Sequence, residues 1–135
     1  MAEVASSRDV QPAALAEEAV KELQHAQQLK STAAKLQQRL EELSAEAAEH
    51  TRVIDTLKDL DPKRTCFRLV GELLVERDVG SVLPELEQNL SRIVAACKKL
   101  DEQRISTEKQ ANEILKNHAP LLEEMGRRRV QEDQL

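Results

Sequence analysis

Three histidines and two cysteines are the residues of this sequence best suited to metal binding or nucleophilic chemistry. His25, His50 and His118 are too far apart to form a pair at metal-ligand spacing, and Cys66 and Cys97 form no CxxC motif. The sequence also lacks an HExxH motif, a GxSxG motif and a phosphate-binding glycine loop. We therefore predict no catalytic residue, no metal site and no cofactor, and we do not expect the chain to be an enzyme.

The composition favours long helices over a compact catalytic domain. The 135 residues carry 20 Lys and Arg against 25 Asp and Glu, a net charge of −5, and Phe67 is the single aromatic residue. A globular core normally draws much of its buried area from aromatic side chains. Abundant Ala, Leu, Glu, Gln and Lys are instead typical of coiled coils. The acidic balance argues against a nucleic-acid partner.

Nothing in the sequence predicts export or membrane insertion. The N-terminal segment lacks both a basic start and a continuous apolar run. No stretch approaches the roughly eighteen apolar residues that a membrane-spanning helix needs. Two cysteines do not make a disulfide framework, so we expect a reducing, cytoplasmic location without membrane contact.

The positions of Gly and Pro leave two long uninterrupted runs, residues 13–61 and 85–119. Each is much longer than the mean globular helix of about 11–12 residues. Apolar residues recur along both at alternating spacings of three and four, which predicts a left-handed coiled coil. The first seam is Leu15, Ala19, Glu22, Ala26, Leu29, Ala33, Leu36, Leu40, Leu43, Ala47, His50, Ile54 and Leu57. The second seam is Leu83, Leu86, Leu90, Ile93, Cys97, Leu100, Arg104, Thr107, Ala111, Ile114, His118, Leu121 and Met125.

Two seams of similar length, joined by a short segment, most simply fold back as an antiparallel pair. We expect facing residues to have numbers that sum to about 140. A sum near 147 would instead bury Arg104 against Leu43 and is less favourable. The predicted facing pairs are Leu40 with Leu100, Ala47 with Ile93, Ile54 with Leu86 and Glu22 with His118.

The middle segment changes from helical spacing to dense β-forming residues around one glycine. Cys66 to Val70 and Leu73 to Val79 are predicted as two strands, joined by a turn at Gly71-Glu72. A lone two-stranded hairpin is marginal in water, and this one is apolar on both faces. We therefore expect it to pair with hairpins of other chains, so that the protein does not work as a monomer. The predicted oligomer interface is Phe67, Leu69, Val70, Leu73 and Val75.

Capping and proline rules predict where the helix after the hairpin begins and ends. Ser81 is the expected N-cap of the second helix, with Pro84 in its first turn. Pro120 either ends that helix near Ala119 or kinks it, and both options stay open. Residues 127–129, three arginines, are predicted to belong to a charged tail. The predicted organisation is an N-terminal tail at 1–11, helix 1 at 12–60, a hairpin segment at 61–81, helix 2 at 82–125 and a C-terminal tail at 126–135.

The end of the seam distant from the hairpin is rich in alanine, at Ala19, Ala26 and Ala33. Alanine buries little apolar area, so we expect this end to be the least tightly packed, with apolar side chains partly exposed. Exposed apolar patches often mark binding sites, although singly exposed apolar residues without a role are about as frequent. The predicted binding residues at this end are Leu15, Val20, Leu23, Leu121, Leu122 and Met125.

Four motifs stand in order between residues 50 and 87: VIDTLK (53–58), CFRLVG (66–71), LLVER (73–77) and VLPELE (82–87). In order and spacing they resemble the central segment of β-type prefoldins, and the flanking helices match only in heptad character. Glu72 stands where these proteins commonly have a second glycine, which leaves the turn type open. Asp78 and Gly80 also depart from the usual pattern.

The resemblance implies a mainly α fold: a long antiparallel two-helix coiled coil with a single β-hairpin between the helices. It implies a subunit that assembles with other α- and β-type prefoldin subunits in a hetero-hexamer, through a platform of hairpins. It also implies capture of non-native actin and tubulin at the coiled-coil tips. Delivery to the cytosolic group II chaperonin, without ATP, would follow.

A coiled-coil scaffold or tethering subunit of another complex is the alternative function, because the charge pattern is compatible with both. A prefoldin subunit should need partner subunits for a defined hexamer and should suppress aggregation of unfolded actin, whereas a tether should do neither. An enzyme would require a concave site with perturbed titratable groups.

Overall fold

The computed structural model describes residues 12–133. They form, in chain order, helix α2 (Pro12–Lys58), strand β1 (Thr65–Val70), strand β2 (Leu73–Asp78), helix α3 (Val79–Asn117) and helix α4 (Ala119–Asp133). The predicted fold class is therefore confirmed: the chain is mainly α, with a single β-hairpin between two long helices. The predicted tail at 1–11 lies outside the described residues. None of the helices described is long and apolar enough to cross a membrane.

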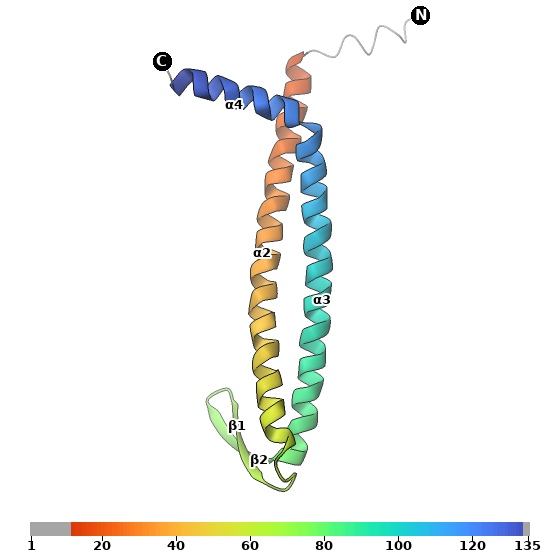
Figure 1. Ribbon diagram of the computed structural model, residues 1–135, viewed down its shortest axis with the longest axis vertical. Helices are drawn as coiled ribbons and strands as arrows, with labels where there is room; N and C mark the ends of the chain where they lie inside the picture. The colour runs from red at the N-terminus through yellow and green to blue at the C-terminus, as the bar shows by residue number, and fades with distance from the viewer. Residues whose placement is uncertain (1–11, 134–135) are drawn as a thin grey trace, which may run out of the picture. The chain divides into compact units, whose positions relative to one another are not determined.

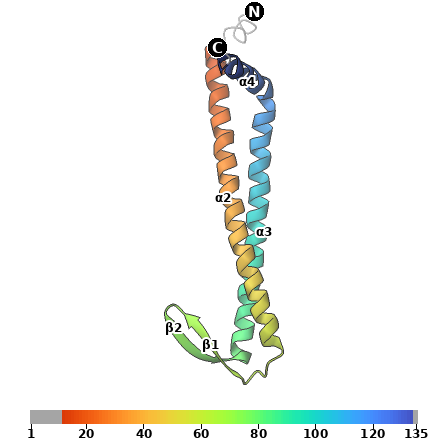
Figure 2. The same ribbon diagram turned by 60° about the vertical axis from the view of Figure 1, so that its left-hand side comes forward.

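The chain divides into two compact units, which we describe separately. The terminal unit consists of the chain up to Lys35 and from Gln103 onward, and the central unit is Leu36–Glu102. In each unit a stretch of α2 lies beside a stretch of α3 that runs in the opposite direction (Figure 1, Figure 2). The hairpin belongs to the central unit and α4 to the terminal unit.

The burial of side chains follows the predicted seams. Eleven of the thirteen positions of the first seam are buried or half-buried, the exceptions being Leu15 and Glu22. In the second seam only Met125 is exposed. The intervening charged positions are mostly exposed, which is the expected pattern for an amphipathic helix packed along one face.

The predicted register is confirmed in the terminal unit at Glu22 and His118. The Nε2 atom of His118 lies 2.5 Å from a carboxylate oxygen of Glu22. Nearby, the Nζ atom of Lys30 donates a hydrogen bond of 2.7 Å to the side chain of Asn112, a pair whose numbers sum to 142. The other predicted facing pairs stay predictions.

The two units bury different kinds of side chain. Ala26, Ala33 and Ala111 of the terminal unit are between 0% and 2% exposed. Ala26 and Ala33, two of the three alanines expected at the less tightly packed end, are thus covered by neighbouring atoms, and the looser packing of that end stays a prediction. The buried residues of the central unit are larger: Leu43, Ile54, Val79 and Val82.

The two strands pair in antiparallel register, from Val70 opposite Leu73 to Thr65 opposite Asp78. Gly71 has a φ of 63°, and no other described residue has a positive φ. A positive φ at the first turn position alone is the pattern of a type II′ turn, so Glu72 can occupy the second position. The predicted strands are confirmed apart from their ends, because Thr65 belongs to β1 and Val79 is helical.

Helix α3 begins at Val79, before the predicted start at residue 82, and Ser81 is not its N-cap. Asp78 takes that role, because its Oδ1 atom accepts a 2.8 Å hydrogen bond from the backbone N–H of Ser81. Hydrogen bonds from the side chain and the backbone of Ser81 lower the pKa of Asp78. Strand β2 therefore runs directly into the helix.

The junction between strand and helix also explains two residues of the sequence. The backbone N–H of Gly80 donates a 2.8 Å hydrogen bond to the carbonyl of Pro62. A Cβ atom at Gly80 would lie 3.2 Å from that carbonyl oxygen, which is a tight contact. Because the helix starts early, Pro84 lies inside α3 rather than in its first turn, and the carbonyl of Gly80 loses its usual intrahelical donor.

The second long helix ends before Pro120, and a new helix follows. Proline at 120 has no N–H for the carbonyl of Lys116, and its ring crowds that carbonyl. Helical bonding resumes when the N–H of Leu122 donates to the carbonyl of His118 at 3.1 Å. Within the terminal unit, α4 leaves the line of α3 (Figure 1). The predicted C-terminal tail is wrong for residues 126–133, which are helical, whereas 134–135 lie outside the described residues.

Candidate functional site

The hairpin displays its apolar side chains to solvent. The lowest exposed fraction among its large apolar residues is 38%, at Val75, and the highest is 72%, at Leu73. Among residues 12–133 the sheet has two strands, so each strand has one backbone edge that no other described strand pairs. The exposed set contains the five predicted interface residues and one that the prediction left out: Phe67, Leu69, Val70, Leu73, Val75 and Leu74.

The pairing register assigns the hairpin residues to two faces. The Phe67 face consists of Thr65, Phe67, Leu69, Leu74, Glu76 and Asp78. The Arg77 face consists of Cys66, Arg68, Val70, Leu73, Val75 and Arg77. Every residue of the Phe67 face is exposed, whereas the three half-buried residues of the hairpin, Cys66, Arg68 and Arg77, all lie on the Arg77 face. The two apolar faces are therefore not equivalent.

Three charged residues, which we call the Glu85 cluster, join the Arg77 face to helix α3. The Nη1 atom of Arg68 donates to Oε2 of Glu85 at 2.5 Å, and Nη2 of Arg77 donates to Oε1 at 2.7 Å. The hydrogen bond from Arg77 lowers the pKa of Glu85, and the same bond raises the pKa of Arg77. Sequence reasoning missed this cluster, because nothing periodic connects its three positions.

The six predicted binding residues all belong to the terminal unit. Leu15, Val20, Leu122 and Met125 are exposed, at fractions between 38% and 55%. Leu23 and Leu121 are half-buried. Val130 is a further exposed apolar residue, at 57%, on the part of α4 that was predicted as a tail.

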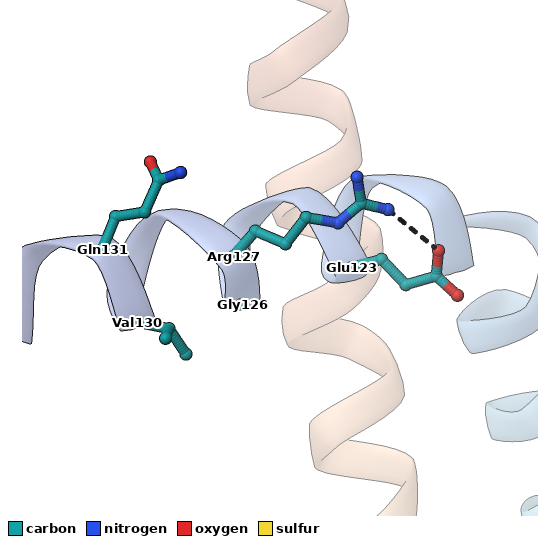
Figure 3. Close-up of a pocket in the computed structure, with 5 residues that line it drawn as sticks. All are labelled: Glu123, Gly126, Arg127, Val130 and Gln131. Atoms are coloured by element: carbon teal, nitrogen blue, oxygen red, sulfur yellow. Dashed lines mark ion pairs between the residues drawn. The ribbon is translucent and has the colours of Figure 1, made fainter.

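Helix α4 carries two shallow hollows that share Gly126. The first is lined by Leu122, Met125, Gly126 and Arg129. The second is lined by Glu123, Gly126, Arg127, Val130 and Gln131 (Figure 3). Gly126 contributes no side chain, and a Cβ atom there would meet no atom within 4 Å. The space beside Gly126 is therefore open.

Two of the three consecutive arginines of α4 pair along the helix. Arg127 pairs with Glu123 at 3.8 Å, and Arg128 pairs with Glu124 at 3.1 Å. Figure 3 shows the Arg127 side chain directed toward Glu123. Such pairs at a spacing of four residues support an exposed helix. They help to explain why residues 126–133, predicted as a tail, are helical although α4 has no buried residue.

The chemistry-bearing residues lie in separate places. The Nδ1 atom of His50 lies 2.9 Å from the carbonyl of Glu46 on its own helix, and His25 is exposed. Cys66 and Cys97 are free thiols. Within residues 12–133, no group of three or more His, Cys, Asp and Glu side chains could hold a metal ion.

Comparisons with known families agree with this arrangement of helices and hairpin. A family model described as "Prefoldin subunit" matches residues 20–124. The chain therefore belongs to the prefoldin subunit family, a family of co-chaperone subunits rather than enzymes.

Among individual relatives the chain is similar to prefoldin subunit 2 of several eukaryotes. It is 38% identical over 93 residues to a probable prefoldin subunit 2 of Dictyostelium discoideum, covering 69% of this chain and 80% of that protein. It is 46% identical over 77 residues to human prefoldin subunit 2, covering 57% of this chain and 50% of the relative. The chain thus spans about half the length of the human protein.

A solved structure shares the fold at low sequence identity. The prefoldin beta subunit from Thermococcus strain KS-1 superposes with a TM-score of 0.69 at 15% identity. The match covers 84% of this chain and 96% of that subunit. At this identity the likeness shows a common fold of helices and hairpin.

Proposed function

We propose that this chain is a β-type subunit that assembles through its β-hairpin with other α- and β-type prefoldin subunits into a hetero-hexamer. The observation that carries the proposal is the exposure of Phe67, Leu69 and Leu74, at 62% to 68%, on a sheet that has two strands in the described part of the chain. An isolated hairpin of this kind is marginal in water. Strands of other subunits would cover the side chains and pair the free backbone edges.

The proposal extends to the terminal unit, where non-native polypeptides such as actin and tubulin would be held. Leu15, Val20, Leu122 and Met125 are exposed apolar side chains that could each make a small apolar contact with a client. Each contact is weak alone, and several subunits acting together raise the combined affinity. Because each contact is weak, the client can also be released quickly. The proposed destination is the cytosolic group II chaperonin, reached in the cytoplasm without ATP.

Co-expression with the other prefoldin subunits tests the assembly step. The complex is purified through a tag on this chain, and the mass of the intact particle is measured. We expect one particle with six subunits and a fixed composition. Recovery of the chain as a monomer, or in particles of variable composition, would contradict the proposal and would favour the tethering function.

An aggregation assay tests the holding step with the assembled complex. Serine replacements at Val20, Leu122 and Met125 should raise the light scattering of diluted, unfolded actin relative to the unmodified complex. The matched control replaces Val53 and Val94, which are exposed apolar residues of the central unit at 37% and 55%. Equal suppression by both variants would contradict the assignment of clients to the terminal unit.

A further inference from the structure

The Glu85 cluster connects both strands of the hairpin to one carboxylate of α3. Arg68 comes from β1 and Arg77 from β2, and the register puts both side chains on the Arg77 face. Each oxygen of Glu85 accepts a short hydrogen bond, and Nη1 of Arg77 makes a longer contact of 3.4 Å to Oε2. Charge-assisted contacts of this kind, with one guanidinium reaching both oxygens, fix direction as well as distance.

This connection covers part of the Arg77 face, where Arg68 and Arg77 are half-buried, whereas Leu73 on the same face stays 72% exposed. Figure 2 shows the hairpin beside the first turns of α3, where Glu85 lies. The arginines and Glu85 are themselves only partly covered, with side-chain exposures of 31% and 43%. Because the Arg77 face is held toward α3, the Phe67 face must point away from it. Without the carboxylate, two positive charges on one face would have no counter-charge within the cluster.

We propose that Glu85 is a positioning residue for assembly, which orients the hairpin so that the Phe67 face is presented to partner subunits. The consequence for assembly rests on the proposed function, whereas the orientation is a property of the single chain. A hairpin that swings freely spends only a fraction of its time in the orientation that a partner can bind. The apparent affinity for partners then falls by that fraction.

Distances between spin labels measure the orientation directly in the full-length chain. One label is placed at the exposed turn by Glu72→Cys and the other on α3 by Ser91→Cys, which is also exposed. The native thiols are removed by Cys66→Ser and Cys97→Ala. All four positions lie in the central unit, so the measured distance does not depend on the terminal unit.

In this background Glu85→Gln removes the charge of the carboxylate and keeps the size of the side chain. We expect the width of the distance distribution to increase about twofold, because the hairpin then samples more orientations. The matched control is Glu87→Gln, an exposed position on the same helix, which should leave the distribution unchanged. An unchanged width in the Glu85 variant, or an equally broad distribution in the reference chain, would overturn the proposal.

A combined variant separates the cluster from a general loss of stability. Arg68→Gln with Arg77→Gln should broaden the distribution as much as Glu85→Gln does. Adding Glu85→Gln to these two changes should add nothing, because residues that act as one unit are not additive. Additive broadening would mean that Glu85 acts through other contacts and would overturn the assignment.

Assembly with the partner subunits provides the functional readout. The Glu85→Gln chain should need roughly a tenfold higher concentration for half-maximal hexamer formation, with unchanged helix content by circular dichroism and unchanged assembly of Glu87→Gln. Broader distances with normal assembly would overturn the positioning role. If the reference chain forms no hexamer at all, the proposed function fails, and the label distances still decide whether Glu85 holds the hairpin.

Discussion

The hairpin and helix α4 both expose apolar side chains, but they differ in what their backbones require. Every internal N–H and C=O of a helix is bonded within the helix. A partner of α4 therefore needs to supply only apolar contacts to Leu122 and Met125, and no backbone hydrogen bonds. The strands of the hairpin have free edges, and Leu69 and Leu74 are displayed beside unpaired backbone groups. A strand edge selects another strand in a fixed register, whereas a helix face accepts many chains.

The two units also differ in the size of the side chains that they bury. The terminal unit buries alanines, whose low exposure demands close packing but contributes little apolar area. The central unit, to which the hairpin belongs, buries branched aliphatic residues. We infer that the unit proposed for permanent assembly is supported by the larger side chains, and the unit proposed for transient holding by the smaller ones.

The largest effect should follow from charges on the Phe67 face. Leu69 and Leu74 are direct cross-strand partners and are 68% and 65% exposed. Replacing both with lysine puts like charges opposite one another and should weaken assembly by roughly 100-fold or more. Light scattering on mixed subunits measures the loss, and circular dichroism checks that the helices persist. Hexamer formation at the same subunit concentrations as the unmodified chain would contradict the proposal that the hairpin, unlike α4, serves assembly.

The second-largest effect, on the free energy of unfolding, should follow from a cavity in the central unit. Ile54 is 4% exposed, so Ile54→Ala should lower the free energy of unfolding by about 2–5 kcal/mol. Val53→Ala is the neighbouring control, because Val53 is 37% exposed, and it should cost less than about 1 kcal/mol. Urea denaturation measures both values. Equal costs would mean that the seam does not form the core described here.

Replacing a buried alanine with a larger residue tests the packing of the terminal unit. Ala33 is 2% exposed and Ala34 is exposed. Ala33→Leu should destabilise the chain by about 1–3 kcal/mol through overpacking, and Ala34→Leu should be nearly neutral. Thermal denaturation compares the two variants. Stabilisation by Ala33→Leu would instead support loose packing at this end of the helices.

The smallest effect should come from pH. The pKa values of Asp78 and Glu85 are lowered by their hydrogen bonds, so the folded state favours the ionised forms. Their contribution is complete above the ordinary carboxylate pKa of about 4 and is lost as the pH falls through the lowered values. The melting temperature should therefore decline on acidification, and less so in an Asp78→Asn, Glu85→Gln variant. Parallel declines would contradict this role.

The sequence was sufficient for the features that repeat or cluster locally. The spacing of three and four placed Ala26, Ile54 and Ala111 on buried faces, because one face of each helix must be covered. Dense β-forming residues around Gly71 located the hairpin to within one residue at the strand ends. The exposure of its apolar residues also followed, since one pair of strands cannot bury both of its faces.

The features that depend on specific three-dimensional contacts were not predictable. Asp78 caps α3 because β2 delivers it directly to the helix start, and a capping rule applied to Ser81 cannot detect that junction. The Glu85 cluster joins residues of three elements, so no spacing reveals it. The continuation of α4 past residue 126 was missed because three consecutive arginines are typical of a charged tail. In the structure Arg127 and Arg128 pair with glutamates of the same helix.

Amide hydrogen exchange before and after mixing with the other prefoldin subunits tests the central claim most directly. We predict that amides of residues 65–78 become strongly protected on mixing, while those of α4 keep their exchange rates until an unfolded client is added. Unchanged exchange across the hairpin, with new protection confined to the helices, would contradict the account.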